Sequence, residues 1–381
     1  MKIRKELDWG RTTPRPILTV KPCRILSQER ILEGKMPCGL PNNLVKKLLA
    51  VQLLGSLACG QPLCAAQELR EVIVSHSDKN GILQLFRMKE DGSESSQLTH
   101  SKNGCRMPSV SPDGRKLIYV EPADGSLALW LSDISGNNIR PLIRKGRNLL
   151  PSWLPDSRHV VWMKVQQEDR RQDPASKSRL HLVDTRTGAT RRLFSDPEQI
   201  KYSNAMASVA PDGQTVAFVS NRSGSFRVWV SKLDGSKARL ISPVDHERDR
   251  DLRLPIEQKV PVWSPDGKWI AHWEGVEMIH MSPYTGVKDP EKDRAISKTF
   301  SVWVAGSNGK TRRRIGAGDD PSWSPDGFVT RAFPDRERGG PKVMIETQKG
   351  EKALEIVPRG RSWGRFSWIP ARPSTEASPS P

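Results

Sequence analysis

One turn motif, repeated five times, constrains the fold of this chain more than any other feature. Each copy places Pro and Asp before a Gly or Ser, at 111–114, 154–157, 210–213, 264–267 and 324–327. Pro fixes φ at the first corner of a tight turn, Asp can bond the backbone that follows it, and Gly tolerates a left-handed exit. Pro also stands three residues before four of the copies, and a Trp directly precedes three of them (Trp153, Trp263 and Trp323). Five such copies indicate a structural repeat.

Each copy of the motif belongs to a unit that reads as four short strands. An apolar, strand-like run follows every turn, at 116–120, 159–163, 215–219, 268–273 and 328–333. A second run comes next, at 127–131, 179–183, 226–230, 300–304 and 342–345. A polar turn and a further run, such as 238–241, end the unit. Together with the run before the motif this makes four strands, which is typical of a β-propeller blade.

The two ends of the chain predict how the blades close. Residues 72–78 resemble 218–224, a second strand that runs into its loop, and 83–86 and 95–98 supply a third and a fourth strand. No first strand precedes them, but residues 366–370 match 321–325, which is a first strand. We therefore expect an all-β, six-bladed propeller whose last blade combines three N-terminal strands with one C-terminal strand. Such closure hides the sheet edges that would otherwise be open to mispairing.

The repeat resembles the TolB-type propeller family, whose units carry the sequence Trp-Ser-Pro-Asp-Gly. The resemblance covers about residues 70–370 and implies the propeller fold. TolB itself has an α/β domain ahead of its propeller, and we expect none here. Related propellers form the non-catalytic part of prolyl-oligopeptidase-like enzymes and the body of oligogalacturonate-lyase-like enzymes. The resemblance therefore implies a shape more strongly than an activity.

Charge and aromatic content point to the surface and to the packing. The formal charge is +18; residues 1–66 hold eleven Lys or Arg and four Asp or Glu, which leaves +11 for the remainder. This surplus suits an anionic envelope polysaccharide, a lipid headgroup or an acidic protein surface, or is simply a solvated basic surface. No nucleic-acid motif occurs, so we expect no nucleic-acid partner. The 12 Trp fall mostly at equivalent positions of the repeat and are expected to pack between blades.

The N-terminal region has the pattern of an export signal. Basic residues at 46–47 precede an apolar run at 48–57 and the small residues before a cleavage site after Ala66. We expect residues 1–35 to be an extension, with Met36 as the true start, 36–66 to be a signal peptide, 67–370 the propeller and 371–381 a disordered tail. The predicted location is periplasmic or secreted. Lipid attachment at Cys59 is disfavoured by a poor lipobox, and Cys105 is then the sole Cys of the mature chain, which excludes an internal disulfide.

The long connections are predicted to gather on one face of the propeller. The Pro-Asp-Gly turns occupy one face, whereas the connections 164–178, 195–204, 243–259 and 274–298 belong to the other, which we call the loop face. Binding residues usually lie on such loops. The candidate contact residues are Arg170, Arg171, His246, Arg248, Arg250, Met278, His280 and Tyr284, whereas mixed charge for solubility is the alternative explanation. The turn residues Asp113, Asp156, Asp212, Asp266 and Asp326 are interpreted as structural.

Catalysis finds little support in the sequence. No Gly-x-Ser-x-Gly elbow or phosphate-binding Gly loop occurs. A metal centre in a lyase-like channel would use histidines from different blades, His76, His100, His246 and His280, but no local ligand pair accompanies them. We expect a monomeric, non-catalytic scaffold without a cofactor that binds a protein or a cell-envelope component. A metal-dependent polysaccharide lyase and a purely architectural ring are the alternatives.

Overall fold

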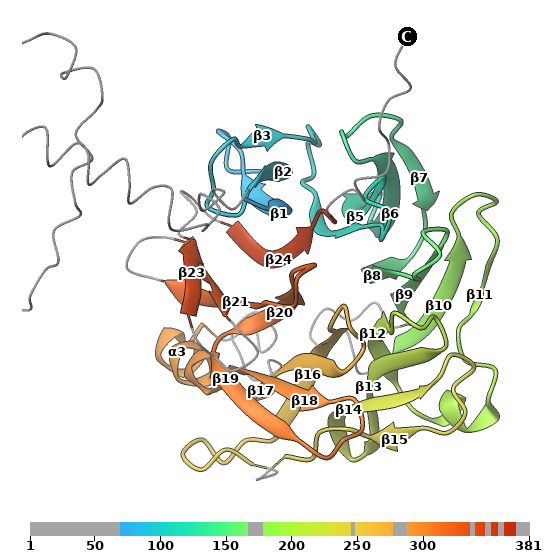
Figure 1. Ribbon diagram of the computed structural model, residues 1–381, viewed down its shortest axis with the longest axis vertical. Coiled ribbons are helices and arrows are strands. Elements are labelled where there is room, and N and C mark those ends of the chain that lie inside the picture. The colour runs from blue at the N-terminus through green and yellow to red at the C-terminus, as the bar shows by residue number, and fades with distance from the viewer. Residues whose placement is uncertain are drawn as a thin grey trace, which may run out of the picture. The chain divides into compact units, whose positions relative to one another are not determined.

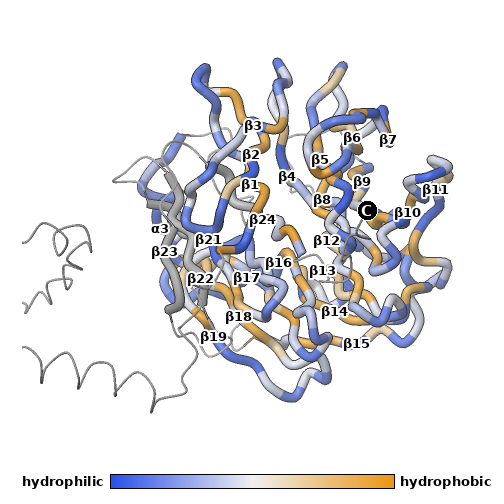
Figure 2. The backbone as a smooth tube through the Cα atoms, turned by 45° about the horizontal axis from the view of Figure 1, so that its top comes forward, coloured by the Kyte–Doolittle hydropathy of each residue, from blue (hydrophilic) through white to orange (hydrophobic). Residues whose placement is uncertain are grey.

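The computed structural model describes residues 69–166, 178–244, 248–276, 288–335, 340–346, 352–356 and 362–370. These ranges are built almost entirely of antiparallel strands, arranged as sheets that fan out around a centre (Figure 1). Apolar residues concentrate in the strands and hydrophilic residues in the connections (Figure 2). No helix in this part of the chain combines the length and the apolar character needed to cross a membrane.

Residues from opposite ends of the chain share the first sheet. Its order is β24-β1-β2-β3. The bounds are β24 (Ser362–Trp368), β1 (Glu71–Ser77), β2 (Leu83–Lys89) and β3 (Ser96–Gln97). Val72 lies opposite Trp368 and Ile73 opposite Ser367 in an antiparallel ladder. The C-terminal strand therefore pairs with β1, as the sequence predicted.

The next eight strands form two four-stranded groups joined at one point. They are β4 (Arg106–Val110), β5 (Lys116–Ala123), β6 (Ser126–Asp133), β7 (Arg140–Ile143), β8 (Arg147–Trp153), β9 (His159–Val165), β10 (Ser178–Asp184) and β11 (Thr190–Arg192). Both β5 and β7 pair with β6, while β8, β9, β10 and β11 follow one another. A single parallel pair, Leu127 with Arg147, links β6 to β8.

Three further four-stranded sheets complete the described chain, each in sequence order. The first holds β12 (Asn204–Val209), β13 (Thr215–Ser223), β14 (Ser225–Lys232) and β15 (Arg239–Leu240). The second holds β16 (Ile256–Trp263), β17 (Trp269–Val276), β18 (Ser301–Gly306) and β19 (Arg312–Ala317). The third holds β20 (Asp319–Trp323), β21 (Val329–Asp335), β22 (Gly340–Glu346) and β23 (Lys352–Ile356).

Two short helices lie in connections that the sequence analysis left irregular. The 3-10 helix η3 (Pro197–Lys201) precedes β12, and α3 (Pro290–Thr299) lies between β17 and β18. Asp289 caps α3 by accepting a hydrogen bond from N of Lys292 at 2.9 Å, Pro290 follows the cap, and Ile296 is buried. The expectation of an irregular loop through 274–298 was therefore wrong at both ends. The strand β17 continues to Val276 at the start of this range, and the helix α3 occupies its last part.

The repeated Trp and Pro of the motif have different structural roles in the first strand of each four-stranded group, which we call the inner strand. The indole nitrogens of Trp153, Trp263 and Trp323 donate to backbone oxygens of Ser109, Ser208 and Val262, at 2.9, 3.1 and 3.0 Å. Each acceptor belongs to the inner strand of the preceding group, so each Trp joins two neighbouring groups. Four of the six inner strands that the structure describes carry Pro where the ladder shifts register, because Pro has no N–H to donate.

These register shifts are bulges with a shared backbone conformation. The residue just before the Pro, or before Ala207 in β12, has a left-handed φ between 44° and 55°, at Met107, Leu150, Met206, Val260 and Asp320. Such a φ is uncommon outside glycine, so its fivefold recurrence is a property of the repeat. Each first strand also adjoins the next one along the chain, and β24 adjoins both β20 and β4.

Arg70, just before β1, fastens the first sheet to the last. Its guanidinium pairs with Glu90 and with Asp326, both at 2.5 Å. It also stacks over the rings of Phe328 and Trp368, with centroids 5.0 and 4.9 Å away. One side chain therefore contacts β24, the end of β2 and the turn between β20 and β21.

Candidate functional site

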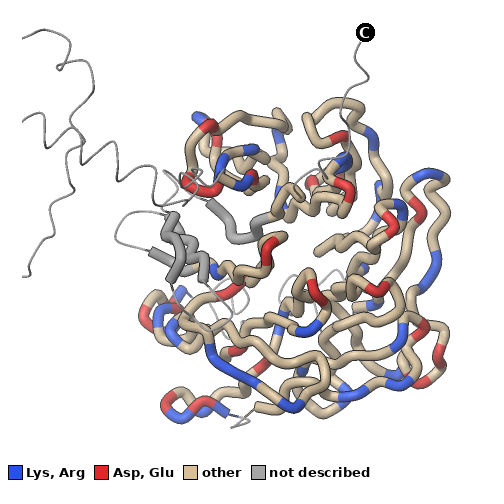
Figure 3. Tube along the Cα trace, viewed as in Figure 1, with Lys and Arg blue, Asp and Glu red and all other residues tan. Residues whose placement is uncertain are grey.

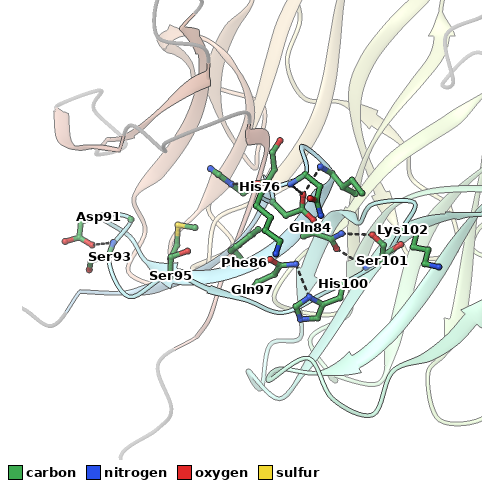
Figure 4. A pocket seen from close by; sticks show the side chains of 17 residues that line it. His76, Gln84, Phe86, Asp91, Ser93, Ser95, Gln97, His100, Ser101 and Lys102 are labelled. Atoms are coloured by element: carbon green, nitrogen blue, oxygen red, sulfur yellow. Dashed lines mark hydrogen bonds between the residues drawn. The ribbon is translucent and has the colours of Figure 1, made fainter.

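A groove of about 1030 Å³ runs along the sheet that contains the N-terminal strands (Figure 4). It begins at the end of β1 and the β1–β2 turn, follows β2 and β3, and reaches the β2–β3 connection. The turn between β1 and β2 is a second-to-third connection, and the segment between β3 and β4 is a fourth-to-first connection. One end of the groove therefore belongs to the loop face.

A buried glutamine builds the loop-face end of this groove. Gln84 of β2 is 1% exposed. Its Nε2 donates to the Ser101 oxygen at 2.6 Å, and its Oε1 accepts from Oγ1 of Thr99 at 2.8 Å and from N of Ser101 at 3.1 Å. Oγ of Ser101 donates in turn to Glu121 of β5 at 2.6 Å. Gln84 thus fixes the connection from β3 to β4, because a buried amide is costly unless it is bonded.

Two of the four histidines proposed as metal ligands line the groove. The ring of His76 meets Phe86 edge to face, with centroids 5.4 Å apart, and its Nδ1 lies 2.7 Å from the Ser77 oxygen. Nε2 of Gln97 lies 3.1 Å from Nδ1 of His100. This contact ties the end of β3 to the connection that follows it.

A metal centre finds no further support in these contacts. His246 and His280, the other two proposed ligands, lie outside the described residues. Within the ranges that the structure describes, no three His, Cys, Asp or Glu side chains come together in a way that could hold a metal ion. We therefore build no chemistry on a metal in this groove.

The middle of the groove is apolar and its rim is polar. Phe86 and the buried Met88 form the floor and pack against Val72, Val74 and Trp368. The carboxylates on the rim are engaged in turns: Oδ1 of Asp78 accepts from two backbone N–H groups, and Oδ1 of Asp91 accepts from N of Ser93. Hydrogen bonding to Ser93 lowers the pKa of Asp91.

Two exposed lysines remain at the loop-face end. Lys79 lies in the β1–β2 turn and Lys102 in the β3–β4 connection, and neither pairs with an acidic side chain in the described part of the chain. The groove thus offers an apolar floor, amide groups and two free ammonium groups.

Two of the predicted loop contacts, Arg248 and Arg250, are described by the structure, and neither is among the residues that line this groove. Arg248 and Arg250 lie before β16, where Nη1 of Arg248 donates to the Arg253 oxygen at 2.9 Å and Asp249 accepts from two backbone N–H groups. They are exposed and lie in the connection between β15 and β16. Arg170, Arg171, His246, Met278, His280 and Tyr284 lie outside the described residues.

The aspartates of the repeated turns bond the backbone that follows them. Asp212 accepts from N of Gln214 at 2.8 Å and from N of Thr215 at 3.0 Å. Asp113, Asp156 and Asp266 accept from backbone N–H groups two residues on. Burial raises the pKa of Asp212, but the hydrogen bonds from Gln214 and Thr215 outweigh it and the pKa is lowered. Asp326 differs, because its Oδ1 accepts from Oγ of Ser324 at 2.6 Å and from Arg70.

Sequence reasoning missed the residues that shape the groove. Gln84 stands between Leu83 and Leu85, and a polar residue in an otherwise apolar run is a signal for a buried hydrogen-bond partner. Arg70 offered no such signal, because its partners come from other parts of the sequence, most of them more than 250 residues away. The aromatic ring of Phe86 was counted only as part of a strand.

The comparisons with known proteins agree on the fold. A family model described as TolB beta propeller domain matches residues 72–283. A protein TolB homolog of Chlorobium luteolum is 25% identical over 167 residues, which are 44% of this chain and 35% of that protein. The chain spans about a third of the length of the curated TolB homologs that it matches.

Solved structures extend this likeness over most of the chain. The crystal structure of TolB from Acinetobacter baumannii covers 87% of this chain and 74% of its own, with a TM-score of 0.59 and 19% identity. A chain of a nidogen/laminin complex covers 79% of this chain and 98% of its own, with a TM-score of 0.54 and 9% identity. At these identities the likeness concerns the fold alone.

Proposed function

Because this chain belongs to the family of the TolB beta propeller domain, we propose that it is a six-bladed propeller serving as an exported, non-catalytic binding scaffold. Six four-stranded groups support the blade count: β24 with β1–β3, β4–β7, β8–β11, β12–β15, β16–β19 and β20–β23. The cyclic contacts of their first strands support closure by β24. The export signal predicted before Gln67 supports a periplasmic or secreted location.

The groove of the first sheet is the observation that carries the proposal. It is long, it has an apolar floor at Phe86 and Met88, and its rim is rich in amide and hydroxyl groups. An extended segment of a partner protein needs apolar pockets for side chains and polar groups for its backbone. A groove built on strands is also rigid, which reduces the ordering cost of binding. The partner is therefore a protein of the cell envelope.

The loop face supplies the remaining contacts of this proposal. Lys79 and Lys102 stand where the groove opens onto that face. Arg248 and Arg250 belong to the connection before β16, on the same face of the propeller. We assign partner contacts there to these two arginines and to Arg170, Arg171, His246, Met278, His280 and Tyr284.

Site-specific photo-crosslinking in cells that export the chain tests the proposal. A photoreactive amino acid is placed at Asn80 or Ser95 in the groove, and at Asn308 or Thr187, which lie in third-to-fourth turns of other sheets, away from the loop face. We expect one discrete crosslinked polypeptide from the two groove positions and none from the two controls. No crosslink in the groove, or the same products from all four positions, would contradict the proposal.

A further inference from the structure

The positive charge of this chain is concentrated in a short stretch. Residues 140–192 contain thirteen Lys or Arg against five Asp or Glu, a surplus of eight within a chain whose total is +18. The undescribed connection 167–177 contributes nothing to that surplus, because it has three residues of each sign. Lys and Arg recur along β7 to β11 and their connections (Figure 3).

Six of these cations form what we call the β8–β11 cationic surface. Its members are Arg144, Lys145, Arg147, Lys164, Arg179 and Arg192. Four of them are exposed, and Arg147 and Arg179 are half-buried.

The cations follow one another across neighbouring strands. Lys164 of β9 is the register partner of Arg179 of β10. Arg192 of β11 lies opposite His181, two residues along β10 from Arg179. The β7–β8 connection reaches the same place, because a side chain added at Gly146 would lie 3.5 Å from Cε of Lys164. Arg144 and Lys145 thus adjoin the end of β9.

The acidic residues of this stretch that the structure describes are already paired. Asp184 pairs with Arg158, and Asp156 pairs with His159 at 2.6 Å. They are the acidic residues of 140–192 that the structure describes, and neither touches the cationic surface. Arg179 donates instead to the backbone oxygens of Tyr202 and Ile200, both at 3.1 Å. Within the described part of the chain, no acidic side chain pairs with the six cations of this surface.

His181 lies beside the cations of this surface, and its pKa is sensitive to their charge. It lies against Trp162, with ring centroids 5.2 Å apart, and faces Lys164 from β9 and Arg192 from β11. Burial, followed by the charges of Lys164 and Arg192, lowers the pKa of His181 to about 4. A bound anion would relieve the repulsion from these two cations and raise that pKa again.

We propose that the β8–β11 cationic surface binds an anionic polysaccharide with a carboxylate on every sugar, a site separate from the groove of the first sheet. Adjacent strands lie about 4.8 Å apart, so cations on neighbouring strands are closely spaced. A ligand that pairs with several of them needs negative charges at a similar spacing. An extended peptide presents same-side carboxylates only every second residue, about 6.8 Å apart. The exposed ammonium and guanidinium groups suit a hydrated polyanion, which needs no apolar anchor.

Binding of a mannuronate hexamer to the whole mature chain tests this assignment. The binding variant is Lys145→Gln, Lys164→Gln, Arg192→Gln, and the control variant is Lys232→Gln, Lys237→Gln, Lys310→Gln, which removes the same charge from exposed positions elsewhere. We expect salt-sensitive binding, weakened about tenfold or more in the first variant and less than about twofold in the second. The pKa of His181, followed by NMR, should rise on saturation in the wild type.

Three comparisons decide the outcome. A neutral glucose hexamer should not bind, and a hexaglutamate peptide or vesicles of anionic phospholipid should bind more weakly than the mannuronate hexamer. Absence of binding, equal loss in both variants, or an unmoved His181 would overturn the proposal. Tighter binding of the peptide or the vesicles would also overturn it, since it would assign the surface to another class of partner.

Discussion

At the scale of single residues, burial changes the protonation of side chains inside this propeller. His272 of β17 is fully buried, and its Nε2 lies 3.1 Å from Oγ of Ser242. Burial, together with the charge of Arg312, lowers the pKa of His272 to about 3. His272 lies within 268–273, which the sequence predicted to be a strand, and the structure places it in β17.

His272 should make stability depend on pH in the mildly acidic range. Its folded pKa lies below its unfolded value near 6.5, so acid protonates the unfolded chain first and stability falls as pH drops below that value. Between the two pKa values, one such group lowers the free energy of unfolding by about 1.4 kcal/mol for each pH unit of acidification. We expect His272→Gln to lose less unfolding free energy between pH 7 and pH 5 than the wild type does, in urea titrations. His100→Gln, at an exposed position, should behave as the wild type. An unchanged pH slope in His272→Gln would refute this.

The repeated indole hydrogen bond gives a second prediction at this scale. Trp323→Phe keeps a ring but leaves the Val262 oxygen without its donor at 3.0 Å. Loss of a buried partner typically costs about 1–3 kcal/mol of unfolding free energy. Trp269→Phe is the control, because its indole makes no hydrogen bond to a described residue. Equal urea midpoints for the two variants would show that the hydrogen bond contributes nothing.

Secondary structure elements show what local sequence can and cannot predict. Strands and turns were predictable because the motif recurs, and five independent copies outweigh the ambiguity of any one. The helix α3 carried its signals, Asp289 before Pro290, but with a single buried residue, Ile296, its apolar face is too narrow for periodicity to detect. The left-handed φ of Val260 could not be predicted, since β-branched residues avoid that region.

Arg70 offers a prediction at the scale of elements, because it holds β24, β2 and the β20–β21 turn together. Arg70→Met removes two ion pairs and two ring contacts and should cost about 2 kcal/mol or more, since Glu90 is left buried without its charge partner. Arg87→Met is the matched control in the same sheet. Its pair with Glu71 is about one-third exposed on both sides and should be worth less than about 1 kcal/mol.

Thermal unfolding of these two variants provides the comparison. The melting temperature should fall clearly more for Arg70→Met than for Arg87→Met. If the melting temperatures of the two variants fall by the same amount, Arg70 does not stabilise the contact between the first and last sheets.

The whole molecule depends on joining two ends of the sequence that lie almost three hundred residues apart. The matching of 366–370 with 321–325 made this pairing predictable. The N-terminal unit lacks a first strand, and the C-terminal segment is a first strand with no further strands after it, so the two complete one sheet. The groove was not predictable in the same way. Phe86 of its floor and Gln84 and His76 of its loop-face end come together only once β1 and β2 are paired. The proposed scaffold function rests on that composite sheet.

Hydrogen exchange of the chain from Gln67 onward, followed by mass spectrometry, tests this closure most directly. Peptides covering 70–77 and 362–370 should both exchange slowly, since Ile73 pairs with Ser367 and N of Ile369 donates to the Glu71 oxygen at 2.9 Å. They should also lose protection together as urea is added. Exchange of 362–370 at the rate of an unstructured peptide, while 70–77 stays protected, would show that β24 does not complete the first sheet.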